Sequence, residues 1–172
     1  MSDVEAKIGV YYRREDCLGL GRRLLIDFVD LATMMLLSFF VVSRTANIQP
    51  RWIGPLCLLA VWVGYFVGLK ATPLGTLGYL LGGAKVVDLS GQRPSLAALA
   101  QRMFMGLAGG FTMIADMASM VSDPGRRAIR DRVSGTYLIK KSAQPAGSGP
   151  IVMRTMTFMG VTVQAKDVTG AP

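Results

Sequence analysis

The feature that most constrains this chain is an apolar run from Leu24 to Val42 that begins beside charged residues. The run has 19 residues, and at about 1.5 Å per residue it matches the ~30 Å of hydrocarbon in a bilayer. Arg23 precedes the run, and Asp27 and Asp30 lie inside it. Spacings of four and seven residues from Arg23 place all three side chains on one helix face. Such charges persist where they face protein or water, so we predict a membrane helix over 23–43 that carries a polar site.

A second apolar segment runs from Trp52 to Leu69 without a charged residue. Its 18 residues predict a second membrane helix, with Trp52 placed as an interfacial anchor. Within it Ala60, Gly64 and Gly68 recur every four residues, a spacing that lets another helix approach closely. The alternative is the ordinary glycine content of membrane helices, and the sequence favours neither interpretation.

The third apolar segment, Leu96 to Val121, carries Arg102 near its start and a Gly106/Gly110 pair at its centre. The pair could seat a neighbouring helix or interrupt this one. With a cytoplasmic N-terminus, a third full crossing would place the six basic residues of Arg126–Lys141 outside. That arrangement conflicts with the positive-inside rule. We therefore favour a glycine-broken hairpin or an interfacial helix over a third span.

The composition supports a membrane protein and excludes several other classes. Hydrophobic residues make up 51% of the chain and charged residues 17%, and the mean hydropathy is +0.41. The net charge of +8 comes largely from residues that flank the apolar runs, which suits anionic lipids better than nucleic acid. The chain has no histidine and two cysteines, Cys17 and Cys57, at different predicted depths. We therefore expect no metal site, no cofactor and no enzymatic activity.

These observations predict an all-α membrane protein with two membrane helices, a third glycine-interrupted apolar helical segment and short juxtamembrane strands. The strands are expected at Lys85–Leu89 and Thr136–Ile139. Residues 1–22 would form a charged cytoplasmic arm, 23–141 the membrane domain, and 142–172 a flexible linker and C-terminal tail. No cleavable signal peptide is evident, so the first helix is expected to remain as a signal anchor.

Four short blocks in the same order resemble the RDD family of membrane proteins, named for one arginine and two aspartates. Arg23 and Asp30 match the first block, and Asp27 is an additional carboxylate beside it. Thr76-Leu77-Gly78 with Val86-Val87-Asp88 and Gly91 resembles the second block, although Tyr79-Leu80 replaces its usual basic residues. Arg102 matches the third block. Asp131 with Gly135-Thr136 matches the fourth.

The resemblance implies an integral, multi-pass protein, expected in a bacterial cytoplasmic membrane with its N-terminus inside. It also implies a transport-related role, since some family members have been linked to sodium/proton antiport. Arg23, Asp27, Asp30, Arg102 and Asp131 are then the candidate ion site, and two or three helices would need a homo-oligomer or a partner membrane protein to enclose a pathway. The alternative is a membrane-anchored interaction or scaffold protein with a basic cytoplasmic face, in which these charges neutralise one another.

Overall fold

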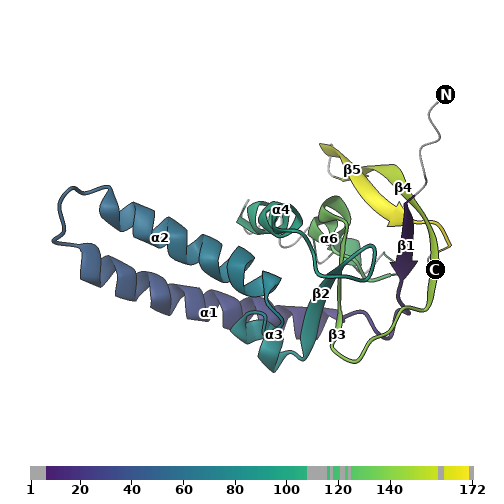
Figure 1. Ribbon diagram of the computed structural model, residues 1–172, viewed down its shortest axis with the longest axis horizontal. Coiled ribbons are helices and arrows are strands. Elements are labelled where there is room, and N and C mark those ends of the chain that lie inside the picture. Colours follow the sequence, from purple (N-terminus) through teal and green to yellow (C-terminus); the bar gives the residue numbers. More distant parts are fainter. Residues whose placement is uncertain are drawn as a thin grey trace.

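The computed structural model describes residues 7–107, 116, 118–120, 123, 125–158 and 161–170. A long helical hairpin projects from a base of shorter helices and strands (Figure 1). The helices are α1 (Leu20–Thr45), α2 (Ile53–Val63), the π-helix η1 (Gly64–Leu69), α3 (Leu77–Leu81), α4 (Leu96–Leu107) and α6 (Ile129–Ser134). The strands are β1 (Ile8–Tyr11), β2 (Ala84–Asp88), β3 (Thr136–Lys140), β4 (Gly147–Phe158) and β5 (Val161–Val168).

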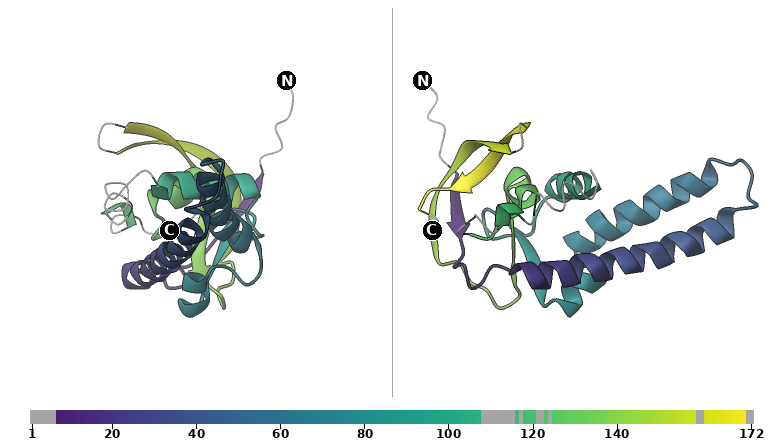
Figure 2. Two further views of the ribbon diagram at one scale, coloured as in Figure 1. Left: turned by 90° about the vertical axis from the view of Figure 1, so that its left-hand side faces the viewer. Right: turned by 180° about the vertical axis from the view of Figure 1, so that it is seen from behind.

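The hairpin consists of α1 and the continuous helix formed by α2 and η1, which run side by side (Figure 2). The 26 residues of α1 are long and apolar enough to cross a membrane, and α1 is the one described helix that meets this test. The returning helix, Ile53–Leu69, is apolar but shorter, and its last six residues are wound as a π-helix.

The surface of this hairpin is strongly apolar. Phe28, Leu36 and Phe39 of α1 are 69%, 72% and 75% exposed, and Leu56 and Leu59 of α2 are more than half exposed. A contiguous apolar surface of this kind is rare on soluble monomers and marks contact with a membrane or a partner. The hairpin is therefore the part of the molecule that requires an apolar environment.

The base contains two antiparallel sheets. Strands β2 and β3 pair from Ala84–Lys140 to Asp88–Thr136, and a three-stranded sheet has the order β1-β4-β5. Val10 of β1 donates a backbone hydrogen bond to Leu89 at 2.6 Å, which links the two sheets. The buried side chains between them include Tyr12, Val87 and Ile139.

A second apolar core joins the base to the foot of the hairpin. Ile26 of α1, Val67 of η1 and Leu99 of α4 are buried in it together with Val86 and Leu138 of the small sheet. The N-terminal part of α1 therefore belongs to the base, while its C-terminal part extends away from the base (Figure 1).

The expectation of an all-α protein with two membrane helices is wrong. Five described strands form two sheets, and only α1 among the described helices has the length and composition of a membrane span. The returning helix is one residue shorter than predicted at its start and changes to π geometry at Gly64. Glycine is a poor α-helix former, and local deviations such as π-bulges occur within otherwise regular helices.

The two ends of the chain also differ from the expected arm and flexible tail. Residues 147–158 and 161–168 form a β-hairpin, and β1 from the N-terminal arm pairs with β4 through Ile8–Pro150 and Tyr11–Gly147. The alternation of hydrophobic and polar residues in the tail is the pattern of strands that bury one face. The two strands expected near the membrane helices are present as β2 and β3, with slightly shifted ends.

Helix α4 has 12 residues, about 18 Å of helix, and is too short to cross a bilayer by itself. Of the two glycines expected to interrupt this segment, Gly106 lies in α4, whereas Gly110 falls outside the described residues. The described part of the segment therefore contains no span.

Two glycines allow α3 to lie directly on α1. A Cβ added at Gly78 would lie 2.5 Å from the backbone oxygen of Ile26 and 2.6 Å from Oδ1 of Asp30. At Gly82 it would lie 2.5 Å from the side chain of Ile26. Gly64, in contrast, has no atom within 4 Å of such a Cβ.

We predict that Gly78→Ala lowers the free energy of unfolding by about 1–3 kcal/mol, because the added methyl group overpacks the contact with α1. Gly64→Ala is the control and is expected to be neutral or stabilising, since it adds helix propensity without a clash. Thermal unfolding of the two variants in detergent, followed by circular dichroism, measures the difference. Equal shifts would show that α3 does not lie as closely on α1 as described.

Candidate functional site

The centre of the base is the carboxylate of Asp131, which lies between two arginines from distant parts of the chain. Arg23 of α1 donates from Nη1 to Oδ2 of Asp131 at 2.5 Å, and Arg102 of α4 pairs with Oδ1. All three side chains are buried. One interaction therefore joins α1, α4 and α6.

The remaining polar atoms of this cluster are also held by the protein. Arg23 donates to the backbone oxygens of Arg126 at 2.9 Å and Leu18 at 3.3 Å, and Arg102 donates to Oγ1 of Thr136 at 2.5 Å. The backbone N–H of Ala128, at the start of α6, donates to Asp131 at 3.2 Å. A buried charge cluster is stable only when its members are hydrogen-bonded in this way.

Burial alone would raise the pKa of Asp131, but the positive charges of Arg102, Arg23 and Arg130 outweigh burial and hold that pKa well below its ordinary value. Asp131 is therefore ionised throughout the physiological range. A group that keeps its charge in this way is suited to bracing the fold rather than to exchanging protons.

Asp30 occupies a separate site, away from Arg23. Its Oδ1 accepts from Tyr65 Oη at 2.9 Å and from the backbone N–H of Gly78 at 2.8 Å, and its Oδ2 accepts from Thr76 Oγ1 at 2.8 Å. Thr76 in turn caps α3. Asp30 thereby ties α1 to η1 and to the first turn of α3.

A third group of charges surrounds Arg130 of α6. Its Nη2 donates to Asp27 of α1 at 2.8 Å, its Nε lies 3.0 Å from Oδ2 of Asp116, and its backbone N–H donates to Oδ1 of Asp116 at 3.1 Å. The three side chains are 14% to 26% exposed. These interactions connect the N-terminal part of α1 to the start of α6.

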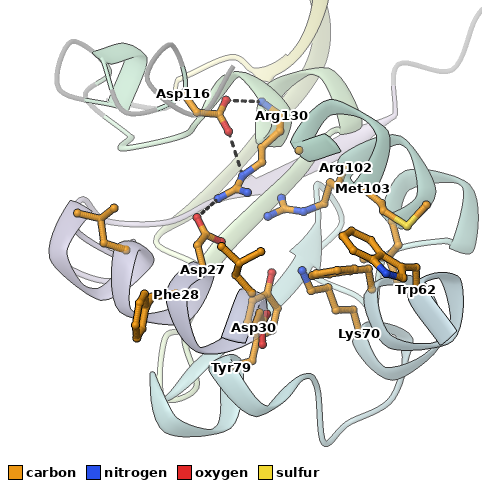
Figure 3. Close-up of a pocket in the computed structure, with 15 residues that line it drawn as sticks. Asp27, Phe28, Asp30, Trp62, Lys70, Tyr79, Arg102, Met103, Asp116 and Arg130 are labelled. Atoms are coloured by element: carbon orange, nitrogen blue, oxygen red, sulfur yellow. Dashed lines mark hydrogen bonds and ion pairs between the residues drawn. The ribbon is translucent and has the colours of Figure 1, made fainter. Parts of the chain in front are cut away.

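Members of all three groups line a cavity of about 430 Å³ between α1, the returning helix and α4 (Figure 3). Its charged lining consists of Asp27, Asp30, Asp116, Lys70, Arg102 and Arg130. Its apolar lining includes Leu24, Phe28, Leu31, Trp62, Phe66, Leu99 and Met103. A mostly apolar cavity with a few convergent polar groups is the usual form of a small-molecule site.

Lys70 differs from the other cations of the cavity. Its Nζ lies 4.8 Å from the ring centre of Tyr79 and 5.0 Å from that of Phe66, which are cation–π distances. Within the part of the chain that the structure describes, Lys70 forms no ion pair, whereas Arg102 and Arg130 each do.

The comparisons with known proteins place this arrangement in a family. The sequence model of the RDD family matches residues 19–135, more than half of the chain, and the match contains every charged residue of the cavity. The chain belongs to the RDD family. No curated protein and no solved structure matched it. The RDD family is generally membrane-associated, in agreement with the apolar hairpin.

The resemblance to the RDD family that the sequence motifs indicated is thus confirmed. The structure brings three of the predicted site residues together, since Arg23 and Arg102 both pair with Asp131. It does not bring Arg23 to Asp27 or Asp30, although all three lie on the same side of α1. Neighbouring charges on one helix here bind three different parts of the base.

Among the predicted helix-packing residues that the structure describes, Gly106 lines the cavity, whereas Ala60, Gly64 and Gly68 do not. Around Gly64 and Gly68 there is open space on the side where a Cβ would point. The small-residue stripe that includes Ala60 therefore does not seat another described helix of the same chain at these glycines.

Tyr65, Lys70 and Arg130 were not among the predicted site residues. Tyr65 carries the one hydroxyl group between Trp52 and Leu69, and Lys70 is the first charge after that run, so both were visible as irregularities. Arg130 had no such signal, because it lies among several basic residues. Within the described residues there is no group of three or more side chains suited to hold a metal ion.

We predict that Asp131→Asn lowers the free energy of unfolding by about 3–5 kcal/mol, because it leaves two buried arginines without their carboxylate. The pKa of Asp131 is lowered in the folded state, so its stabilisation is complete above the ordinary aspartate pKa of about 4 and is lost as the pH falls below it. Unfolding of the wild-type and variant proteins in detergent, measured between acidic and neutral pH, should therefore differ most at neutral pH.

Glu15→Gln is the matched control for this prediction. Glu15 pairs with Arg13 at 3.7 Å with both side chains 72% exposed, and such surface pairs contribute little. If Asp131→Asn lowers the free energy of unfolding at neutral pH as little as Glu15→Gln does, the buried cluster does not brace the fold.

Proposed function

We propose that this RDD protein is a membrane-anchored binding protein in which the charged family residues brace a ligand cavity at the foot of a membrane hairpin. The observation that carries the proposal is that the polar atoms of these residues already bind other groups of the protein. Arg23 and Asp131 bind each other, and Asp30 accepts hydrogen bonds from Tyr65, Thr76 and Gly78. Side chains held in this way can fix the relative positions of α1, α3 and α6 around the cavity.

In this proposal α1 crosses the membrane and Ile53–Leu69 returns through it as the shorter helix, so that the base lies on the side of the N-terminus. Arg44 and Arg51 are the basic residues near the hairpin tip, whereas the base carries most of the others. The positive-inside rule then supports a cytoplasmic base. The basic face would lie against anionic lipids.

A binding role is supported over a catalytic one by the chemistry of the cavity. Apart from Lys70, its charged residues form ion pairs or are hydrogen-bonded to neutral groups, and the described lining has no nucleophile beside a general base. A role in handling protons or cations would require carboxylates that can release these partners. Asp30 has no cation bound to it among the described residues. The binding role and the ion-handling role therefore predict the most clearly different results when Asp30 is substituted.

The topology is tested by single-cysteine labelling in a chain from which Cys17 and Cys57 have been removed. A cysteine at Asn47, beside the hairpin tip, is expected to react with an impermeant maleimide added from outside. A cysteine at Lys141, an exposed residue after β3, is expected to react only after the membrane is opened. Reaction of both sites from outside, or from inside, would contradict a hairpin that crosses and returns.

The bracing role of Asp30 is tested with Asp30→Asn and Asp30→Leu. Asparagine keeps one oxygen for Tyr65 and Gly78, so its stability should be close to wild type, whereas leucine leaves three donors unpaired and should cost about 1–3 kcal/mol for each one that stays buried. Sodium-driven proton flux in proteoliposomes is expected to be absent from wild type and Asp30→Asn alike. Robust wild-type flux that Asp30→Asn abolishes without loss of stability would instead establish ion handling.

A further inference from the structure

We propose that the cavity between α1, η1 and α4 binds a long-chain fatty acid, with the acyl chain along the apolar wall and the carboxylate at Lys70. This inference rests on the proposed binding function and names the ligand class. The cavity and its residues come from the described part of the chain (Figure 3).

The size and chemistry of the walls suit one acyl chain. The volume of about 430 Å³ lies near the lower end of the usual range for ligand pockets, about 300–1,000 Å³, which favours a single chain over the two chains of a phospholipid. Trp62, Phe66 and Met103 form an apolar wall. Methionine and aromatic side chains adapt well to flexible hydrocarbon.

The cavity has a lateral route for such a chain. Phe28 and Leu31 of α1 line it and are also 69% and 53% exposed on the apolar surface of the hairpin. The lining is therefore continuous with the surface that requires an apolar environment. An amphiphile dissolved in the membrane could enter from the side without passing through water.

The charges divide the cavity into two parts. Asp27 and Asp116 share the single cation of Arg130, so this part carries excess negative charge. On the other side, Arg102 shares the one carboxylate of Asp131 with Arg23. With Lys70 and Asp30 counted as well, three positive groups face two negative groups, so this part carries excess positive charge. An anionic head group is therefore directed away from Asp27 and towards Lys70 and Arg102.

Lys70 is the residue suited to receive this head group. Its ammonium group lies over Phe66 and Tyr79 without a carboxylate partner among the described residues, and the nearby Asp30 is held by three neutral donors. A charge-assisted hydrogen bond to a carboxylate is stronger than one between neutral groups. The flexible stem of lysine lets the ammonium follow the head group.

The two tryptophans of the chain allow a direct test. In the Trp52→Phe variant the remaining indole, Trp62, lies in the cavity wall, and in the Trp62→Phe variant the remaining indole, Trp52, lies at the exposed start of the returning helix. Dibrominated stearate, which quenches indole fluorescence on contact, is titrated into each purified protein in a nonionic detergent. We expect saturable quenching of Trp62 that excess oleate reverses, and only weak, linear quenching of Trp52.

The specificity for a carboxylate is tested with the methyl ester of the same dibrominated acid and with a phosphatidylglycerol that carries dibrominated chains. Both are expected to quench Trp62 at least tenfold less effectively at equal mole fraction in the detergent. Equal quenching by the ester would overturn the assignment of Lys70. Stronger quenching by the phospholipid would overturn the choice of a fatty acid.

Three variants in the Trp52→Phe background test the cavity itself. Lys70→Met is expected to weaken dibrominated stearate binding about tenfold, the scale of one charge-assisted hydrogen bond, and Lys70→Arg to retain it. Gly106→Leu, whose side chain would occupy the cavity beside α4, is expected to abolish saturable quenching. Gly64→Leu is the control, because Gly64 faces open space outside the cavity and should leave binding unchanged.

Linear quenching of both tryptophans, or binding that Lys70→Met and Gly106→Leu leave unchanged, would overturn the proposal. These outcomes are distinguishable from failure of the proposed function, since the labelling pattern at Asn47 and Lys141 and the flux assay do not depend on the fatty acid. Circular dichroism and gel filtration identify any variant that fails to fold. Lys70→Arg then keeps the test decisive, because it preserves the charge and most of the packing.

Discussion

The structure depends on one carboxylate, Asp131, buried between Arg23 and Arg102. Each of the three residues belongs to a different helix, so the interaction sets where α1, α4 and α6 stand relative to one another. Breaking one member of such a cluster leaves an uncompensated charge in a site that water does not reach. The apolar core around Ile26 and Leu99 includes residues of two of these helices, α1 and α4, and contributes to the low-dielectric surroundings of the cluster. This cluster therefore connects the hairpin to its base.

The same arrangement explains how α1 tolerates charged residues in its apolar sequence. Arg23, Asp27 and Asp30 all lie in its N-terminal part, which packs against the base. Arg23 reaches α6, Asp27 reaches Arg130, and Asp30 reaches α3. Between Asp30 and Arg44 lie 13 residues, about 20 Å of helix. The part of α1 that extends beyond the base is therefore shorter than the whole helix, and the 26 residues of α1 serve both as anchor and as core helix.

Local patterns in the sequence predicted some elements well and others poorly, for identifiable reasons. The long apolar periodicity of α1 and the short β-branched run of β2 were strong signals. Their charged partners were less predictable, because Arg23 and Asp131 are separated by 108 positions and helix geometry reports only on neighbours. The order of the family motifs nevertheless identified Arg102 and Asp131 as candidate site residues. The all-α expectation failed at the tail. Glycine and proline between 145 and 150 indicated a linker, although residues 147–150 pair with β1 as part of β4, the central strand of the larger sheet.

That pairing has a consequence for biosynthesis. Strand β1 is synthesised before the hairpin, while its partner β4 is synthesised only after the hairpin, α4, α6 and the β2-β3 sheet. Contacts between such distant segments form late, since the intervening chain must be ordered first. The hairpin would therefore enter its apolar environment while β1 is still unpaired. Closure of the β1-β4-β5 sheet then comes after β4 and β5 have been made, so the first described strand joins the last two in a late step of folding.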